Sequence, residues 1–154
     1  MKTQHRRSSH AKRKYQANFS VLSMLIVANS PMPEDHAAEQ IKITMDAFEA
    51  LKSGHGTTKD YDRLARAINL CLVRAESIDT LVVYAMKAAV SAMDSCSDIH
   101  ARHGRYGFTG IDLQSLEYAL EYYAEIFRLS TPRQLMDADN IAFREMRKQM
   151  RAAA

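Results

Sequence analysis

The chain has 154 residues, of which 47% are apolar and 25% are charged, and it contains only five glycines, three prolines and two cysteines. This length and balance fit one soluble globular domain whose core is large enough to fold alone. Two cysteines exclude a disulfide framework, so we expect Cys71 and Cys96 to be reduced core residues of a cytoplasmic protein. The scarcity of glycine and proline favours helix.

The positive charge is concentrated at the N-terminus. The net charge is +3, yet residues 1–15 contain no acidic residue and six basic ones, so the rest of the chain carries −3. The basic residues of this arm are Lys2, Arg6, Arg7, Lys12, Arg13 and Lys14. We predict a disordered basic arm over residues 1–15 that seeks phosphate or an acidic partner, followed by one helical domain over residues 16–154.

An apolar run, FSVLSMLIVA, follows the arm at residues 19–28. It resembles the apolar region of a secretory signal, but no A-x-A-like cleavage site follows it. Ten residues are too few to span a bilayer as a helix. We therefore expect a segment that docks on the core, with a targeting signal as the alternative, and no membrane partner.

Apolar residues spaced three and four apart predict five helices, over residues 34–53, 58–77, 80–102, 112–129 and 132–151. Thr57 or Thr58, Asp79, Asp112 and Thr131 are the expected N-caps, and the sequence after Thr131 matches a capping box with an N-terminal proline. The helix over 80–102 is apolar on most sides, which predicts that it is central to an all-α bundle.

The stretch RHGRYGFTG, residues 102–110, contains three of the five glycines. Gly104 can end the preceding helix in the left-handed conformation, and the other glycines let the chain reverse. Arg102, Arg105 and Tyr106 could contact phosphates and stack on bases. The alternative is a helix–helix corner packed by its own aromatic side chains.

The last predicted helix ends in a basic cluster, which is also typical of a helix C-terminus. Its members are Arg144, Arg147, Lys148 and Arg151. Together with Arg6, Arg7, Lys12, Arg13 and Lys14 of the arm and the 102–110 loop, they form the candidate nucleic-acid contacts. Contacts of this kind reach phosphates, so binding would depend on salt and have little sequence specificity.

A second candidate surface lies on the predicted helix 112–129. Glu117 and Glu121 repeat at four-residue spacing beside Tyr118 and Tyr122, and this acidic and aromatic face could bind a host or phage protein. The alternative is an ordinary solvated helix face with half-buried tyrosines.

Metal chemistry and catalysis have weaker support. Cys96, His100 and His103 share a helix face and are zinc-ligand types, but structural zinc sites take a second ligand cluster, which the sequence lacks. No phosphate loop, nucleophile elbow, His-Glu-x-x-His motif or dinucleotide fingerprint is present. We therefore expect no cofactor and no enzymatic activity.

Two stretches of the chain carry a family resemblance. Residues 50–69 fit the pattern ALxxGxxTxxDxDxLxxAxN, and GRYGF at 104–108 follows between two long helices. In these features the chain resembles a family of small helical proteins encoded by proteobacteria and their phages and plasmids. The resemblance implies a cytoplasmic accessory protein of a mobile element, and it transfers no catalytic residue.

These observations predict a non-enzymatic accessory or regulatory protein that contacts nucleic acid through its basic segments. The alternative is an adaptor or inhibitor that binds a host protein through the glutamate and tyrosine face. A metalloprotein is the third class. The sequence leaves the oligomeric state open, and its Met-rich helices are compatible with a dimer.

Overall fold

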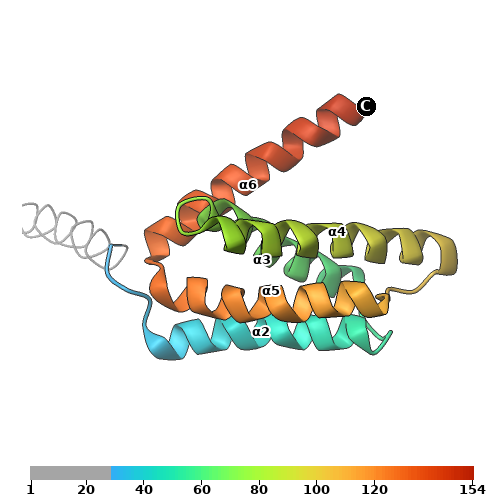
Figure 1. The fold of residues 1–154 in the computed structure, drawn as a ribbon, viewed down its shortest axis with the longest axis horizontal. Helices are drawn as coiled ribbons and strands as arrows, with labels where there is room; N and C mark the ends of the chain where they lie inside the picture. The colour runs from blue at the N-terminus through green and yellow to red at the C-terminus, as the bar shows by residue number, and fades with distance from the viewer. Residues whose placement is uncertain (1–28) are drawn as a thin grey trace, which may run out of the picture.

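The computed structural model describes residues 29–154 and contains five α-helices in this range (Figure 1). They are α2 (Glu34–Lys52), α3 (Thr58–Ala75), α4 (Thr80–His103), α5 (Gly110–Leu129) and α6 (Pro132–Ala153). The prediction of an all-α bundle of five helices is confirmed. The arm over 1–15 and the apolar run over 19–28 lie outside the described residues.

The core lies around α3, which packs against all four of the other helices. Leu64, Ile68, Cys71 and Ala75 line its inner face and are fully buried. They form one cluster with large apolar side chains from the neighbouring helices, including Leu51, Met86 and Leu116. The amphipathic pattern of α3, which is apolar on one face and polar on the other, is that of a helix inside a bundle with one edge in water.

The prediction that the 80–102 helix would be central is wrong. Within residues 29–154, α4 packs mainly against α3 and α5, and its other side carries exposed side chains. Leu81 is 70% exposed and Tyr84 is 65% exposed. The apolar residues on most sides of α4 indicated a buried helix. The central position belongs instead to α3.

Side chains cap the N-termini of four of the five described helices. Thr57 and Thr131 each accept a hydrogen bond from the third residue of their helix, and the side chains of Asp60 and Gln134 accept one from the cap backbone in return. Asp79 accepts from the Leu81 amide at 2.6 Å. These three predicted caps are confirmed, and each satisfies amides that no helical carbonyl can reach.

The predicted cap of α5 is wrong by three residues. Thr109 is the N-cap, and Asp112 occupies the third helical position, where its carboxylate accepts from the Thr109 amide at 3.1 Å. The helix consequently begins at Gly110 rather than at residue 112. Gly104 ends α4 with φ of 71°, as expected for a glycine in the left-handed conformation.

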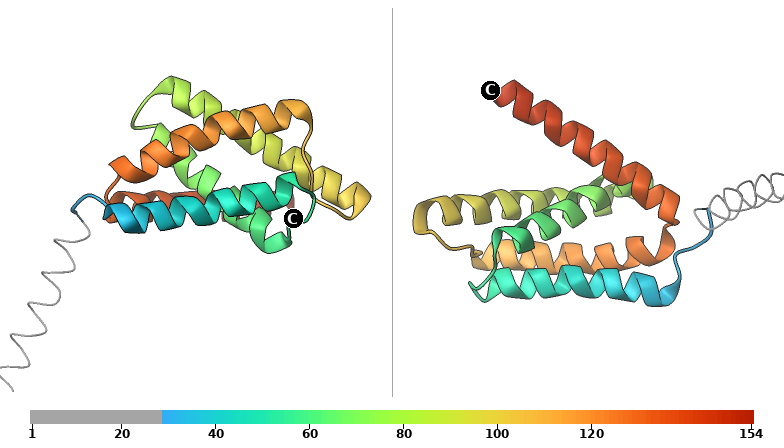
Figure 2. Two further views of the ribbon diagram at one scale, coloured as in Figure 1. Left: turned by 90° about the horizontal axis from the view of Figure 1, so that it is seen from below. Right: turned by 180° about the vertical axis from the view of Figure 1, so that it is seen from behind.

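The helix α6 starts on the bundle and then leaves it (Figures 1 and 2). Leu135 and Ala138 are buried, and Asp139 binds Arg66 of α3. From Asn140 onward every residue is exposed except Ala142, which is half-buried. The C-terminal half of α6 is therefore held by its own backbone hydrogen bonds and by no neighbouring helix in the described part of the chain.

Candidate functional site

The basic residues of α6 form a stripe along its exposed half. Arg144, Arg147, Lys148 and Arg151 stand at spacings of three, four and seven, so their side chains share one side of the helix. All four are exposed. Their positive ends therefore reach water on the segment of α6 that projects from the bundle (Figure 2). We call these four residues the basic stripe.

The intramolecular contacts of the basic stripe are weak. Lys148 Nζ pairs with Glu145 at 2.7 Å, and both side chains are more than half exposed. Arg147 lies 5.8 Å from the ring centroid of Phe143, and Arg144 Nε donates to the Asn140 carbonyl at 3.3 Å. Exposed pairs of this kind contribute about 1 kcal/mol or less, so a phosphate can displace them.

An apolar stripe runs along another side of the same turns. Phe143 is 54% exposed, Met146 is 44% exposed and Met150 is 65% exposed. Their spacing of three and four places them together on the helix surface. The exposed half of α6 thus presents one basic side and one apolar side.

The aromatic side chains of the 102–110 loop pack the corner between α4 and α5. Tyr106 is buried, and its ring stacks on His100 at 4.0 Å and on Tyr61 at 5.2 Å between centroids. Its hydroxyl donates to Thr58 Oγ1 at 3.3 Å. Phe108 lies 6.0 Å from Phe48 between ring centroids. The proposed base-stacking role of Tyr106 is therefore wrong, because both faces of its ring are covered.

The predicted nucleic-acid residues do not form one surface. Arg102 and Arg105 are exposed at the end of the bundle where α4 connects to α5, whereas the basic stripe lies on the projecting half of α6 (Figure 1). Arg6, Arg7, Lys12, Arg13 and Lys14 lie outside the described residues. Within the described residues, the basic stripe therefore gathers four cations on one helix, and Arg102 with Arg105 forms a separate, smaller group.

The metal-ligand candidates are not gathered. Cys96 is fully buried, where burial raises its thiol pKa, and His100 is engaged with the Tyr106 ring. His103 is exposed at the end of α4. Within residues 29–154, no group of three or more His, Cys, Asp or Glu side chains converges in a way that could hold a metal ion.

Both cysteines are free thiols in the core, as predicted. Burial raises the pKa of Cys71 to about 12 and also raises that of Cys96. A thiol is nucleophilic only as its thiolate, so neither side chain is poised for covalent chemistry.

The glutamate and tyrosine face of α5 is partly occupied by its own contacts. The hydroxyl groups of Tyr118 and Tyr122 form a hydrogen bond with 2.8 Å between the oxygens. Their rings pack edge to face, with centroids 5.1 Å apart. Glu117 accepts from Lys52 of α2 at 2.9 Å. Tyr118 is 53% exposed and Glu121 is exposed. The most exposed part of this face is therefore Tyr118 together with Glu121.

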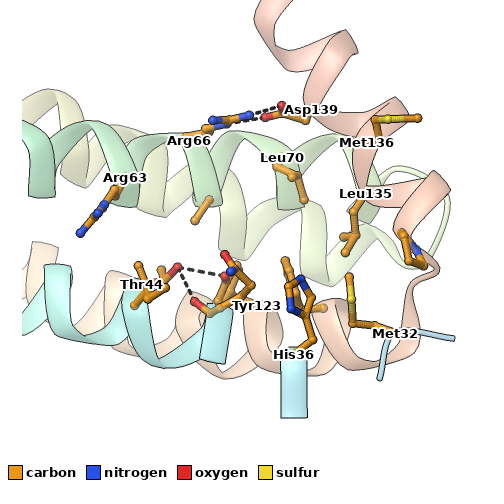
Figure 3. Close-up of a pocket in the computed structure, with 15 residues that line it drawn as sticks. Met32, His36, Thr44, Arg63, Arg66, Leu70, Tyr123, Leu135, Met136 and Asp139 are labelled. Carbon is orange, nitrogen blue, oxygen red and sulfur yellow. Dashed lines mark hydrogen bonds and ion pairs between the residues drawn. The ribbon is translucent and has the colours of Figure 1, made fainter. Parts of the chain in front are cut away.

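Sequence reasoning missed a groove between α2, α3, α5 and α6 (Figure 3). Its volume is about 640 Å³. Met32 and His36 line one end and Arg63 lines the other, while the Arg66–Asp139 pair bridges α3 and α6 along one side. The rest of the lining combines the apolar residues Ile43, Ala67, Leu70, Phe127, Pro132, Leu135 and Met136 with Gln40, Thr44 and Tyr123, which carry polar groups. No local pattern identifies this groove, since residues of four helices line it.

No family model matches the chain, and no curated protein or solved structure matches it significantly. The resemblance to small helical proteins of mobile elements therefore stays a prediction. None of the helices in residues 29–154 combines the length and apolar character that crossing a membrane requires.

Proposed function

We propose that this chain is a non-enzymatic accessory protein that binds nucleic acid through its phosphates, with little sequence specificity. The observation that carries the proposal is the basic stripe. Four cations lie on one side of a helix that projects from the bundle, and an acidic partner in the described chain engages Lys148 alone among them. Guanidinium groups bind phosphate oxygens in a bidentate manner, which favours arginine at such sites.

The stripe has a simpler structural explanation, in which cations merely stabilise the negative end of the helix dipole. That effect is confined to the last turn of a helix. Arg144 stands nine residues before the end of α6 at Ala153, which is more than two turns away. The dipole therefore accounts for Arg151 and leaves Arg144, Arg147 and Lys148 available for another role.

The basic arm extends the proposal beyond α6. Residues 1–15 carry six cations and no acid, which is typical of an arm that seeks phosphate. The assignment to a phage, prophage or plasmid is supported by the resemblance of residues 50–69 and 104–108 alone.

Fluorescence anisotropy with a labelled generic DNA duplex tests the proposal. A variant with Arg144, Arg147, Lys148 and Arg151 all changed to Gln should bind DNA more weakly. The slope of the logarithm of its binding constant against the logarithm of the salt concentration should fall in magnitude by about 0.9 for each phosphate that the protein no longer neutralises. A matched control changes Lys42, Lys59, Lys87 and Arg128 to Gln, which removes the same charge from four other helices. An equal weakening in both variants contradicts a role for the stripe, and no DNA binding by the full chain at low salt contradicts the proposal itself.

One observation supports a second function, the binding of a host or phage protein. Tyr118 is more than half exposed and presents its ring beside Glu121. Tyrosine is enriched in protein interfaces because it buries a large area with two side-chain torsions. A pull-down that loses its partner on Tyr118→Ala, but not on Tyr84→Ala at the exposed position on α4, would favour this function.

A further inference from the structure

We propose that the groove between α2, α3, α5 and α6 is the docking site of the chain's own apolar segment, residues 19–28. The groove supplies the apolar walls, and the segment supplies an uncharged occupant tethered at the end of the groove. This inference does not depend on nucleic-acid binding.

The first support comes from where the described chain begins. Met32 lines the groove, and only residues 29–31 separate it from Ala28, the last residue of the segment. Three residues span at most about 10 Å, so the segment enters the immediate neighbourhood of the groove. A ligand held by so short a tether has an effective concentration in the millimolar range.

The second support is the fit in length. The groove follows α2 at least from His36 to Thr44, and eight residues of helix extend about 12 Å. A ten-residue segment in helical form extends about 15 Å. Residues 19–28 can therefore cover the groove from the Met32 end toward Arg63 without a gap or a large overhang.

The third support is chemical. The segment contains no charged residue, and its only polar side chains are Ser20 and Ser23. In a helical register Phe19, Leu22 and Ile26 form a stripe at spacings of three and four, which Ser23 adjoins, while Ser20 lies away from it. That stripe matches groove walls such as Leu70, Leu135 and Met136, and Ser20 can face water.

The described residues leave these walls open. Met136 is 59% exposed, and Leu70 and Phe127 are only partly buried. Covering apolar surface of this kind is favourable by about 25 cal/mol for each Å² removed from water. The exposed α6 of a second copy could also cover the walls, but it has no tether to Met32.

Photo-crosslinking of the full chain tests the proposal directly. Met136→p-benzoylphenylalanine places a photoreactive ring in the groove, and Ile111→p-benzoylphenylalanine, at the 76% exposed start of α5, is the control. Irradiation of a mixture of 14N- and 15N-labelled protein distinguishes crosslinks within one chain from crosslinks between chains. A crosslink from position 136 to residues 19–28 of the same chain, absent from the control, supports the proposal. Crosslinks confined to residues 29–154, or formed between copies, overturn it.

Thermal unfolding supplies a second test. Leu22→Asp and Ile26→Asp should each lower the Tm by about 5 °C or more, because they place a charge against the groove walls. Ser20→Asp, on the side that faces water, should leave the Tm nearly unchanged. Equal effects of the three variants would overturn the proposal.

Discussion

The hydroxyl groups of Thr44 and Tyr123 lie 2.9 Å apart, which joins α2 to α5 at the floor of the groove. Both residues are buried. Thr44 Oγ1 also lies 3.2 Å from the Gln40 carbonyl, to which it can donate. We assign the Tyr123 hydroxyl as the donor to Thr44, because this arrangement gives both hydroxyl protons an acceptor. Neither group is left without a partner, which is the condition for burying a polar pair without a large penalty.

Removal of this bond should destabilise the fold modestly. Tyr123→Phe keeps the ring and leaves Thr44 bonded to Gln40, so we expect the free energy of unfolding to fall by about 0.5–1.5 kcal/mol. Thr44→Val leaves the tyrosine hydroxyl without its acceptor, and its effect should be larger. Urea denaturation measures both, and a larger loss for Tyr123→Phe than for Thr44→Val would contradict the assigned direction of the bond.

Two buried groups should make the fold sensitive to alkaline pH. Burial raises the pKa of Cys71 from 9.0 to about 12 and that of Tyr123 from 10.0 to about 12. The lower value of each pair is the pKa in the unfolded chain, and the higher value is the pKa in the folded chain. Between the two the unfolded chain releases a proton that the folded chain retains, so stability is intact below pH 9 and falls as the pH rises toward 12. Each group contributes a slope of about 1.4 kcal/mol per pH unit within its own window.

Denaturation curves across about pH 8–11 measure this dependence. Cys71→Ala should reduce the part of the slope that begins near pH 9 and leave the contribution of Cys96, whose pKa burial also raises. Tyr123→Phe should reduce only the part that begins near pH 10. A wild-type stability that stays flat across this whole range would show that these groups do not hold their protons in the folded chain.

The attachment of α6 should depend on one ion pair. Arg66 Nε donates to Asp139 Oδ1 at 2.7 Å, and Nη2 donates to Oδ2, so the pair is bidentate. The Arg66 side chain is 73% exposed, which limits the contribution to about 1 kcal/mol. Asp139→Asn should lower the free energy of unfolding by no more than that amount, and the difference from wild type should shrink at high salt.

Hydrogen exchange shows whether this loss is local. The amides of α6 should exchange faster in Asp139→Asn while those of α3 and α5 do not change. Asp137→Asn is the control, since Asp137 pairs at 3.9 Å with Arg133 on the same helix. Faster exchange throughout the bundle would show that the Arg66–Asp139 pair stabilises the whole fold rather than the attachment of α6 alone.

Gly56 should tolerate no side chain. A Cβ atom there would lie 2.8 Å from the backbone Cα of Leu51 and 2.5 Å from its Cδ2, which is closer than real contacts allow. Leu51 is fully buried and cannot move away freely. Gly56→Ala should therefore lower the free energy of unfolding by about 1–3 kcal/mol.

The matched control is Gly110→Ala. A Cβ at Gly110 meets nothing within 4 Å, and the residue begins α5, where alanine is the better helix former. Its Tm should stay unchanged or rise slightly. Similar losses for the two alanine variants would contradict the crowding at Leu51.

The helices were predictable because their signals are local. Thr131, Pro132 and Gln134 specify the start of α6 with side chains that lie within one turn of one another. The start of α5 was misplaced because threonine and aspartate are both good N-caps, and Thr109 and Asp112 stand three residues apart. Either could have been the cap, and the capping box that joins them was the overlooked signal.

The arrangement of the helices was less predictable. Leu81 and Tyr84 made the 80–102 helix look central, yet no neighbouring helix in the described chain covers their side of α4. Tyr106 could have stacked on a base or on its own chain, and only the approach of His100 and Tyr61 decides between these. The groove depends on the crossing of four helices, and no single stretch of sequence encodes that crossing.

The two stripes of α6 lie on different sides of the same turns. Arg147 and Lys148 project from one side, and Met146 and Met150 from another. A polyanion and an apolar partner could therefore contact the same turns from two sides. Such a segment would act as a bridge that holds the two ligands next to each other on one helix.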